Sequence, residues 1–138
     1  KNKQKKSGYF DEFINRFSHR ILHAGYCETF EDYASLLWQA DICPVTSIQD
    51  FFGISIAEAV YCNTYPLLPD RLAYPEIYKK DNNSHLFYDK ENDLYKKVEM
   101  LLNKNDFNSK NIPKDLIQIF DWTNMIDKYD QLFSSLKK

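Results

Sequence analysis

The sequence has no long apolar run of the kind that crosses a membrane. A membrane-spanning helix needs about 20 consecutive apolar residues, and the chain contains no such run. An apolar signal peptide is also missing from its start, so we expect neither membrane insertion nor export.

Cysteine and histidine are scarce, with three residues of each. The cysteines, Cys27, Cys43 and Cys62, are odd in number and lack the spacing of a zinc site. Each lies in an apolar context, which predicts buried thiols in a reducing compartment, and we expect a cytoplasmic protein. His23 has no partner at ligand spacing and is interpreted as a core histidine. No metal site is predicted.

What the sequence does contain is enough apolar material for one globular domain. The 138 residues are 43% hydrophobic and 16% aromatic, a composition that supports a core.

Four lysines lie in the first six residues, so residues 7–138 carry a net charge of about −6. A domain this acidic is a poor main platform for nucleic acid. We interpret residues 1–7 as a lysine-rich loop or linker end, although an RNA-binding arm is the alternative.

Helical and strand patterns alternate along the chain. This alternation predicts a doubly wound, Rossmann-like α/β fold with a parallel sheet. One helix is predicted to begin at Thr29 and to bury a stripe of Phe30, Tyr33, Ala34 and Leu37, and another is predicted to begin after Gly53. Further helices are predicted at 9–18, 92–102, 113–120 and 123–138. Strands are predicted at 20–26, 42–46, 65–68 and 85–88, and a polar loop at 103–111.

The segment 40–77 concentrates the candidate chemistry in a strand, loop, helix and strand. Asp50 lies in the loop and Glu58 in the helix, near the carboxyl edge of a parallel sheet where open α/β folds bind ligands. First-turn N–H groups of Gly53, Ile54 and Ser55 would be free to bind a phosphate. A Glu58 carboxylate about one turn further on could accept two hydrogen bonds from a ribose diol. The alternative is that Asp50 caps the helix and Glu58 is a solvated helix acid.

The same residues carry a family resemblance. Asp50, then seven intervening residues and Glu58-Ala59, with Phe52-Gly53 between them, resemble the paired-acid motif of retaining GT-B glycosyltransferases of the family 4 type. The string DFFGISIAEAVYCNTYPLLPDRLAYPEIY resembles more narrowly the tRNA-queuosine α-mannosyltransferases. The first acid of the motif is usually Glu and is Asp50 here. Asn63 replaces a usual glycine, and Leu72-Ala73 replaces two.

The resemblance implies that residues 1–138 are the latter part of a carboxyl-terminal, nucleotide-sugar-binding domain whose closing helix is 123–138. It implies a donor site for a nucleotide sugar such as GDP-mannose, with Asp50 and Glu58 as the catalytic acids. Arg71 would meet a phosphate or be an ordinary surface arginine. The resemblance also implies that Tyr26 and Cys27 contact the donor base and that Asp50 binds the sugar hydroxyls. Gly53 and Ile54, beside Phe52, would bind the diphosphate, and Glu58 would bind the ribose.

The implied reaction is retaining transfer of mannose to queuosine in tRNA, without a metal. The acceptor would bind a separate amino-terminal Rossmann-like domain, so we expect this chain alone to be inactive. Two alternatives remain from the sequence. One is a retaining glycosyltransferase with another donor and a glycan, lipid or small-molecule acceptor. The other is a non-catalytic interaction domain of the same fold.

Overall fold

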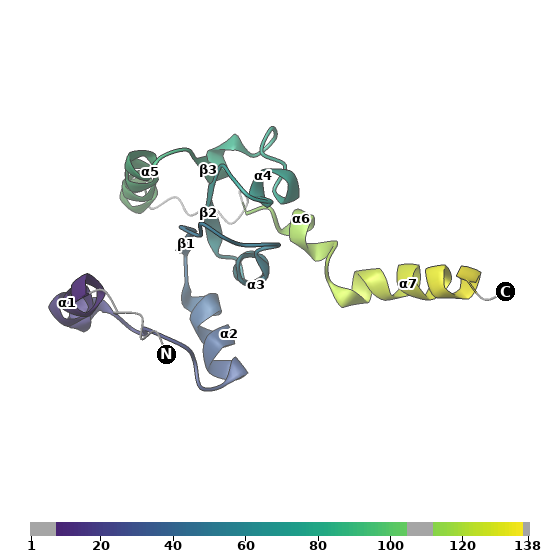
Figure 1. Cartoon of the computed structure of the whole chain (residues 1–138), viewed down its shortest axis with the longest axis horizontal. Coiled ribbons are helices and arrows are strands. Elements are labelled where there is room, and N and C mark those ends of the chain that lie inside the picture. The colour runs from purple at the N-terminus through teal and green to yellow at the C-terminus, as the bar shows by residue number, and fades with distance from the viewer. Residues whose placement is uncertain (1–7, 105–111, 137–138) are drawn as a thin grey trace, which may run out of the picture.

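A small parallel sheet lies at the centre of the chain. The computed structural model describes residues 8–104 and 112–136 (Figure 1). Its strands are β1 (Ile42–Pro44), β2 (Tyr65–Pro69) and β3 (Phe87–Tyr88), in the order β1-β2-β3. In the parallel ladders Ile42 pairs with Tyr65, and Leu68 pairs with Phe87. The fold is therefore mixed α/β, and the predicted strands at 42–46, 65–68 and 85–88 are confirmed with shifted ends.

Seven α-helices and two 3₁₀ turns surround these strands in the described residues. The predicted helices are confirmed within a few residues of their expected ends, and α4 was not predicted. The α-helices are α1 (Gly8–Phe17), α2 (Phe30–Gln39), α3 (Ile54–Tyr61), α4 (Tyr74–Ile77), α5 (Glu91–Lys104), α6 (Lys114–Gln118) and α7 (Trp122–Leu136); the 3₁₀ turns are η1 (Ser18–Arg20) and η2 (Ser84–Leu86). The 1–7 segment and most of the predicted loop at 103–111 lie outside the described residues. Within the described parts, no helix is both long and apolar enough to cross a membrane.

The predicted strand at 20–26 is wrong. Ser18–Arg20 forms η1, and the residues that follow lie in neither a helix nor a strand. A strand is stable when it pairs with a neighbour and buries one face, but Leu22 and Tyr26 are exposed. His23 is also exposed, so its interpretation as a core histidine is wrong for the same reason.

Prolines limit the extent of the sheet. Pro66 and Pro69 lie in β2 and Pro44 ends β1, and proline has no N–H to donate to a ladder. The N–H groups of Tyr65 and Asp70 donate across the sheet, to Asp41 O at 2.8 Å and to Tyr88 O at 3.0 Å. Strand β2 therefore has no backbone donor at two of its five positions, which is consistent with strands of two to five residues.

Helix α3 ends in an αL turn at Asn63, the position where the resemblance predicts glycine. Asn63 has φ 71°, its N–H donates to Val60 O, and the Thr64 N–H donates to Ala59 O at 2.9 Å. These two bonds form a Schellman motif, in which asparagine is the usual substitute for glycine. The buried Thr64 hydroxyl lies 3.0 Å from Ala40 O and so links the end of α2 to the start of β2.

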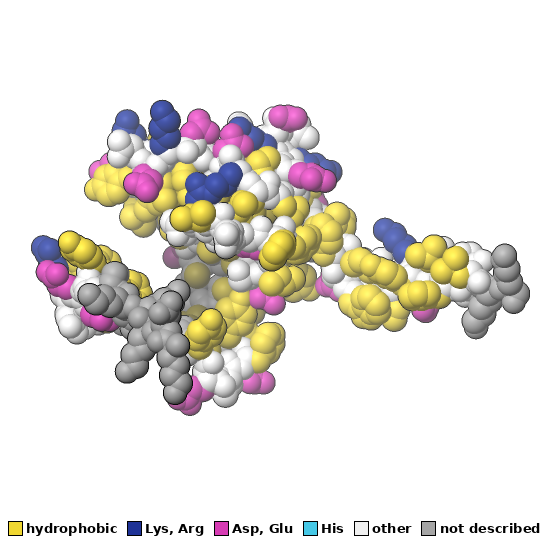
Figure 2. Space-filling view, viewed as in Figure 1, with side chains coloured by type: hydrophobic (Ala, Val, Ile, Leu, Met, Phe, Trp, Pro, Cys, Tyr) yellow, Lys and Arg dark blue, Asp and Glu magenta, His cyan; other side chains and the backbone are white. Residues whose placement is uncertain are grey.

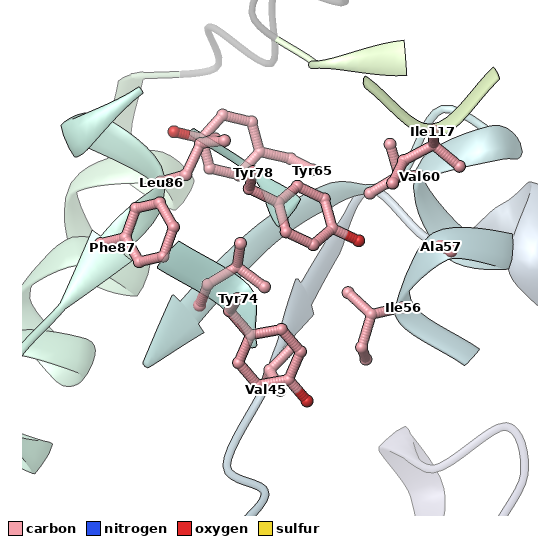
Figure 3. Packing of buried hydrophobic residues seen from close by; sticks show 11 residues of the cluster. Val45, Ile56, Ala57, Val60, Tyr65, Tyr74, Tyr78, Leu86, Phe87 and Ile117 are labelled. Atoms are coloured by element: carbon pink, nitrogen blue, oxygen red, sulfur yellow. The ribbon is translucent and has the colours of Figure 1, made fainter. Parts of the chain in front are cut away.

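The hydrophobic core lies between the sheet and helices α3, α4 and α6 (Figure 3). Strand β2 is buried along its whole length, because it is the central strand and has a neighbour on each edge. Tyr74 and Tyr78, both 1% exposed, contribute two large aromatic rings. The core cluster comprises Val45, Ile56, Ala57, Val60, Tyr65, Leu68, Tyr74, Tyr78, Leu86, Phe87 and Ile117.

Helices α1, α2 and α7 contain no fully buried residue. The predicted buried stripe on α2 is therefore wrong, since Tyr33, Ala34 and Leu37 are half-buried and Phe30 is 70% exposed. The three cysteines are likewise half-buried free thiols, not buried ones. In Figure 1, α1 and α7 project away from the sheet, and Figure 2 shows hydrophobic side chains along α7.

Candidate functional site

Asp50 organises the loop that leads from β1 into α3. Its Oδ1 accepts a hydrogen bond from the Gly53 N–H at 2.8 Å, and its Oδ2 accepts one from the Tyr74 hydroxyl at 2.8 Å. The half-buried carboxylate thus ties this loop to the first residue of α4. Both oxygens already have a partner within the chain, although the N-cap of α3 is Gly53 and not Asp50.

Gly53 takes the left-handed conformation that this turn requires. It has φ 75° and ψ 46°, is buried, and is the N-cap of α3. An added Cβ would lie 2.8 Å from Tyr74 Cε1, so glycine is required here for space as well as for backbone freedom. The prediction that the Gly53 N–H is a free donor is wrong, because that N–H binds Asp50. Within the described residues, the N–H groups of Ile54 and Ser55 have no acceptor.

The Tyr74 hydroxyl donates a hydrogen bond to Asp50 and stays in its neutral, protonated form. Burial, together with the hydrogen bond to the Asp50 carboxylate, raises the pKa of Tyr74 to about 12, because ionisation would place two negative charges side by side in a buried place. The phenol therefore remains a donor at neutral pH.

Glu58 has a different environment from Asp50. It projects from α3 toward α2, where its Oε2 accepts a hydrogen bond from the Tyr33 hydroxyl at 2.7 Å. Burial, then the hydrogen bond and charge of Glu58, raise the pKa of Tyr33 well above its ordinary value. Among the residues that the structure describes, Oε1 of Glu58 has no hydrogen-bond donor. Glu58 thus keeps an acceptor that a ligand can use.

Two cavities meet at Glu58. One, of about 260 Å³, lies between α2 and α3; the other, of about 190 Å³, lies between α3 and the segment from α6 to α7. Phe52 borders the second cavity and packs edge-to-face on Phe120, with ring centroids 4.8 Å apart. The first cavity is lined by Phe30, Tyr33, Ala34, Leu37, Trp38, Glu58, Tyr61 and Cys62, and the second by Phe52, Ile54, Ala57, Glu58, Tyr61, Ile117, Phe120 and Asp121. Aromatic walls with a carboxylate are suited to an apolar ring that carries hydrogen-bond donors; Glu58 supplies a carboxylate to both cavities, and Asp121 adds another to the second.

Arg71 lies in the loop after β2 and contacts the loop after β1. Its Nε donates to Ser47 O at 3.0 Å, and a terminal guanidinium nitrogen donates to Thr46 O at 3.3 Å. The next residue, Leu72, has φ 60°, a conformation that is rare for a bulky side chain and is often found at functional sites. The Leu72-Ala73 pair therefore includes one left-handed residue where the resembling family has two glycines.

Tyr26 and Cys27 lie apart from the two acids. Both line a third cavity, of about 420 Å³, on the face of α2 that carries Asp32, Ser35 and Leu36. Neither borders the two cavities that Glu58 lines. The Tyr26 side chain is fully exposed. The structure thus gathers Phe52, Ile54 and Glu58 around one cavity but does not bring Tyr26 and Cys27 to it.

Two tyrosines of this site were not predicted from the sequence. Tyr33 was expected to be part of an apolar stripe, and Tyr74 was not considered. A phenol among apolar helix positions is a usable signal, because a buried tyrosine hydroxyl usually finds a partner. The partner residue lies 24 or 25 positions away in the sequence, so the local sequence pattern does not reveal which residue it is. In the described ranges no group of three or more His, Cys, Asp or Glu side chains is placed to hold a metal ion.

A mannosyltransferase is among the relatives that comparison with known proteins finds. The chain is 35% identical over 89 residues to the tRNA-queuosine alpha-mannosyltransferase of Drosophila melanogaster. The aligned region is 64% of this chain and 22% of the relative, so the chain spans about a fifth of that protein's length. No family model matches the chain, and no solved structure matches it. The similarity supports the resemblance to tRNA-queuosine mannosyltransferases and suggests a glycosyltransferase origin.

Proposed function

We propose that this chain is the donor-binding part of a retaining GT-B glycosyltransferase that transfers mannose from GDP-mannose to queuosine in tRNA. The observation that carries the proposal is the 35% identity to the fly tRNA-queuosine alpha-mannosyltransferase. The parallel sheet supports it, because the loops that follow β1 and β2 carry Asp50 and Arg71 at the edge where α/β folds bind ligands.

In this proposal Glu58 binds the ribose diol through its unoccupied Oε1. The Ile54 and Ser55 amides at the start of α3 bind the diphosphate, and Arg71 adds a positive charge nearby. Asp50 has both oxygens engaged, so it acts on the sugar mainly by shaping the loop. Catalysis then depends on a further domain, which would bind the tRNA and complete the charge stabilisation.

The proposal is tested by calorimetric titration of GDP, UDP and GDP-mannose into the full natural polypeptide that contains this chain. We expect selective binding of the guanine nucleotides. Glu58→Gln should weaken GDP binding by about 1–3 kcal/mol, the cost of losing a charged hydrogen-bond acceptor. The matched control is Glu99→Gln, which removes the same charge from an exposed position of α5 and should have no effect.

Folded protein that binds no nucleotide contradicts the proposal, and tighter binding of UDP than of GDP would indicate a different donor and acceptor. With GDP binding established, mannosylation of queuosine-containing tRNA by the same polypeptide tests the acceptor. Addition of unmodified tRNA controls for non-specific transfer.

A non-catalytic interaction domain is the second candidate. It is favoured by the saturated carboxylate of Asp50 and by the exposed apolar residues of α7, among them Trp122 and Phe133, both 60% exposed. Under this candidate, Asp50→Ala and Glu58→Ala leave the association with a partner protein intact, and nucleotide binding is absent from the start.

A further inference from the structure

We propose that Tyr33 is a positioning residue that holds Oε2 of Glu58 and so presents Oε1 to the ribose diol of the donor; this inference rests on the proposed function. Tyr33 lies on α2 and Glu58 on α3, and the 2.7 Å bond between them joins the two helices. A carboxylate has two oxygens that accept hydrogen bonds, and here the chain occupies one of them.

The contact fixes the side chain that the ligand would meet. A glutamate on an open helix surface samples several rotamers, and ordering it on binding reduces affinity. The Tyr33 hydroxyl selects one arrangement of Glu58 before the ligand arrives. Both residues line the cavity between α2 and α3, so the pair borders a space that a ligand can enter.

The apolar surroundings strengthen the hydrogen bond between Tyr33 and Glu58. Phe30, Leu37 and Trp38 form apolar walls of the same cavity, and hydrogen bonds to a carboxylate are stronger where water is partly excluded. Within the described residues, Tyr33 is the side chain that donates a hydrogen bond to Glu58, although Trp38 and Cys62 of the same walls also carry donor groups. Tyr61 also lines the cavity, but its hydroxyl donates to Asp121 at 3.2 Å. The geometry therefore assigns the orientation of Glu58 to Tyr33.

The test compares GDP with 2′-deoxy-GDP, which lacks one hydroxyl of the diol. In the full natural polypeptide containing this chain, Tyr33→Phe should lower the affinity for GDP about tenfold, the size of one hydrogen bond to a charged group. It should change the affinity for 2′-deoxy-GDP by less than about twofold, so that discrimination between the two nucleotides collapses. A merely structural role would weaken both nucleotides equally.

Three further variants make the outcome decisive. Tyr65→Phe is the control, because it removes another partly buried hydroxyl, 3.5 Å from His85 O, away from the two cavities; it should leave the discrimination intact. Glu58→Asp keeps the charge but withdraws the carboxylate from Tyr33, and should lose discrimination as Tyr33→Phe does. Glu58→Gln tests the ribose contact itself.

If Glu58→Gln leaves GDP affinity unchanged, the proposed ribose contact fails and the positioning role fails with it. If Glu58→Gln weakens GDP binding while Tyr33→Phe preserves the preference for GDP over 2′-deoxy-GDP, only the positioning role is overturned. Loss of discrimination in both Tyr33→Phe and Glu58→Asp supports it.

Discussion

Gly53→Ala should destabilise the chain strongly, because Gly53 is constrained in two independent ways. Its φ of 75° is left-handed, which costs an alanine roughly 1–2 kcal/mol. The added Cβ would lie 2.8 Å from Cε1 of Tyr74, a ring that is 1% exposed and cannot retreat into solvent. Overpacking of this kind typically costs about 1–3 kcal/mol.

The net effect is slightly smaller than these two costs together. Alanine restricts the unfolded chain, which returns about 0.4–1 kcal/mol, so we expect a loss of about 1–4.5 kcal/mol in the free energy of unfolding. Urea titration followed by far-ultraviolet circular dichroism measures it. A domain of this size has a total stability of roughly 5–15 kcal/mol, so the midpoint should shift clearly.

Two further variants separate the cost of the left-handed backbone from the cost of the added Cβ. Gly25→Ala is the matched control: Gly25 has φ 119°, but an added Cβ meets nothing within 4 Å. Its exposed segment is free to relax, and the loss should stay below about 1 kcal/mol. Gly53→Asn relieves the backbone strain but keeps the Cβ, so it should lie between the alanine variant and the original chain. A Gly53→Ala variant within about 0.5 kcal/mol of the original would refute the reasoning.

Two other predictions concern buried tyrosines. The Tyr78 hydroxyl is buried without a hydrogen-bond partner in the described structure, so Tyr78→Phe should stabilise the chain by about 1–3 kcal/mol in the same urea assay; destabilisation would indicate an unseen partner. The pKa of Tyr74 is raised to about 12 from its ordinary 10, so the folded chain holds this proton more tightly than the unfolded one. The associated stability is complete below pH 10 and is lost between about pH 10 and 12. Tyr74→Phe should lessen this alkaline loss, and an unchanged pH profile would contradict the assignment.

Much of the central unit could be predicted from the sequence because its signals are local. The apolar runs at β1 and β2, and the helical pattern between them, all lie within a segment of 28 residues. The predicted start of a helix at Thr29 is confirmed, and there the Asp32 N–H donates to Thr29 Oγ1. The strand predicted at 20–26 failed because apolar composition alone does not supply a pairing edge or a buried face.

The partners of the two acids could not be predicted for a related reason. Asp50 meets Tyr74, and Glu58 meets Tyr33, only after helices have packed on the sheet. The sequence indicated the acids through their spacing and their family resemblance, but it did not indicate which acid keeps a free oxygen. That distinction depends on tertiary contacts and now separates the expected roles of Asp50 and Glu58.

The prolines of the sheet also have a consequence for how fast this chain folds. Pro44, Pro66 and Pro69 occupy strand positions, and every peptide bond in the described residues is trans. In an unfolded chain each such bond is cis in about 10–30% of molecules and converts over tens to hundreds of seconds. A substantial fraction of refolding molecules must therefore wait for isomerisation before β1 and β2 can pair. Pairing of the sheet should therefore contribute to the slowest refolding phase.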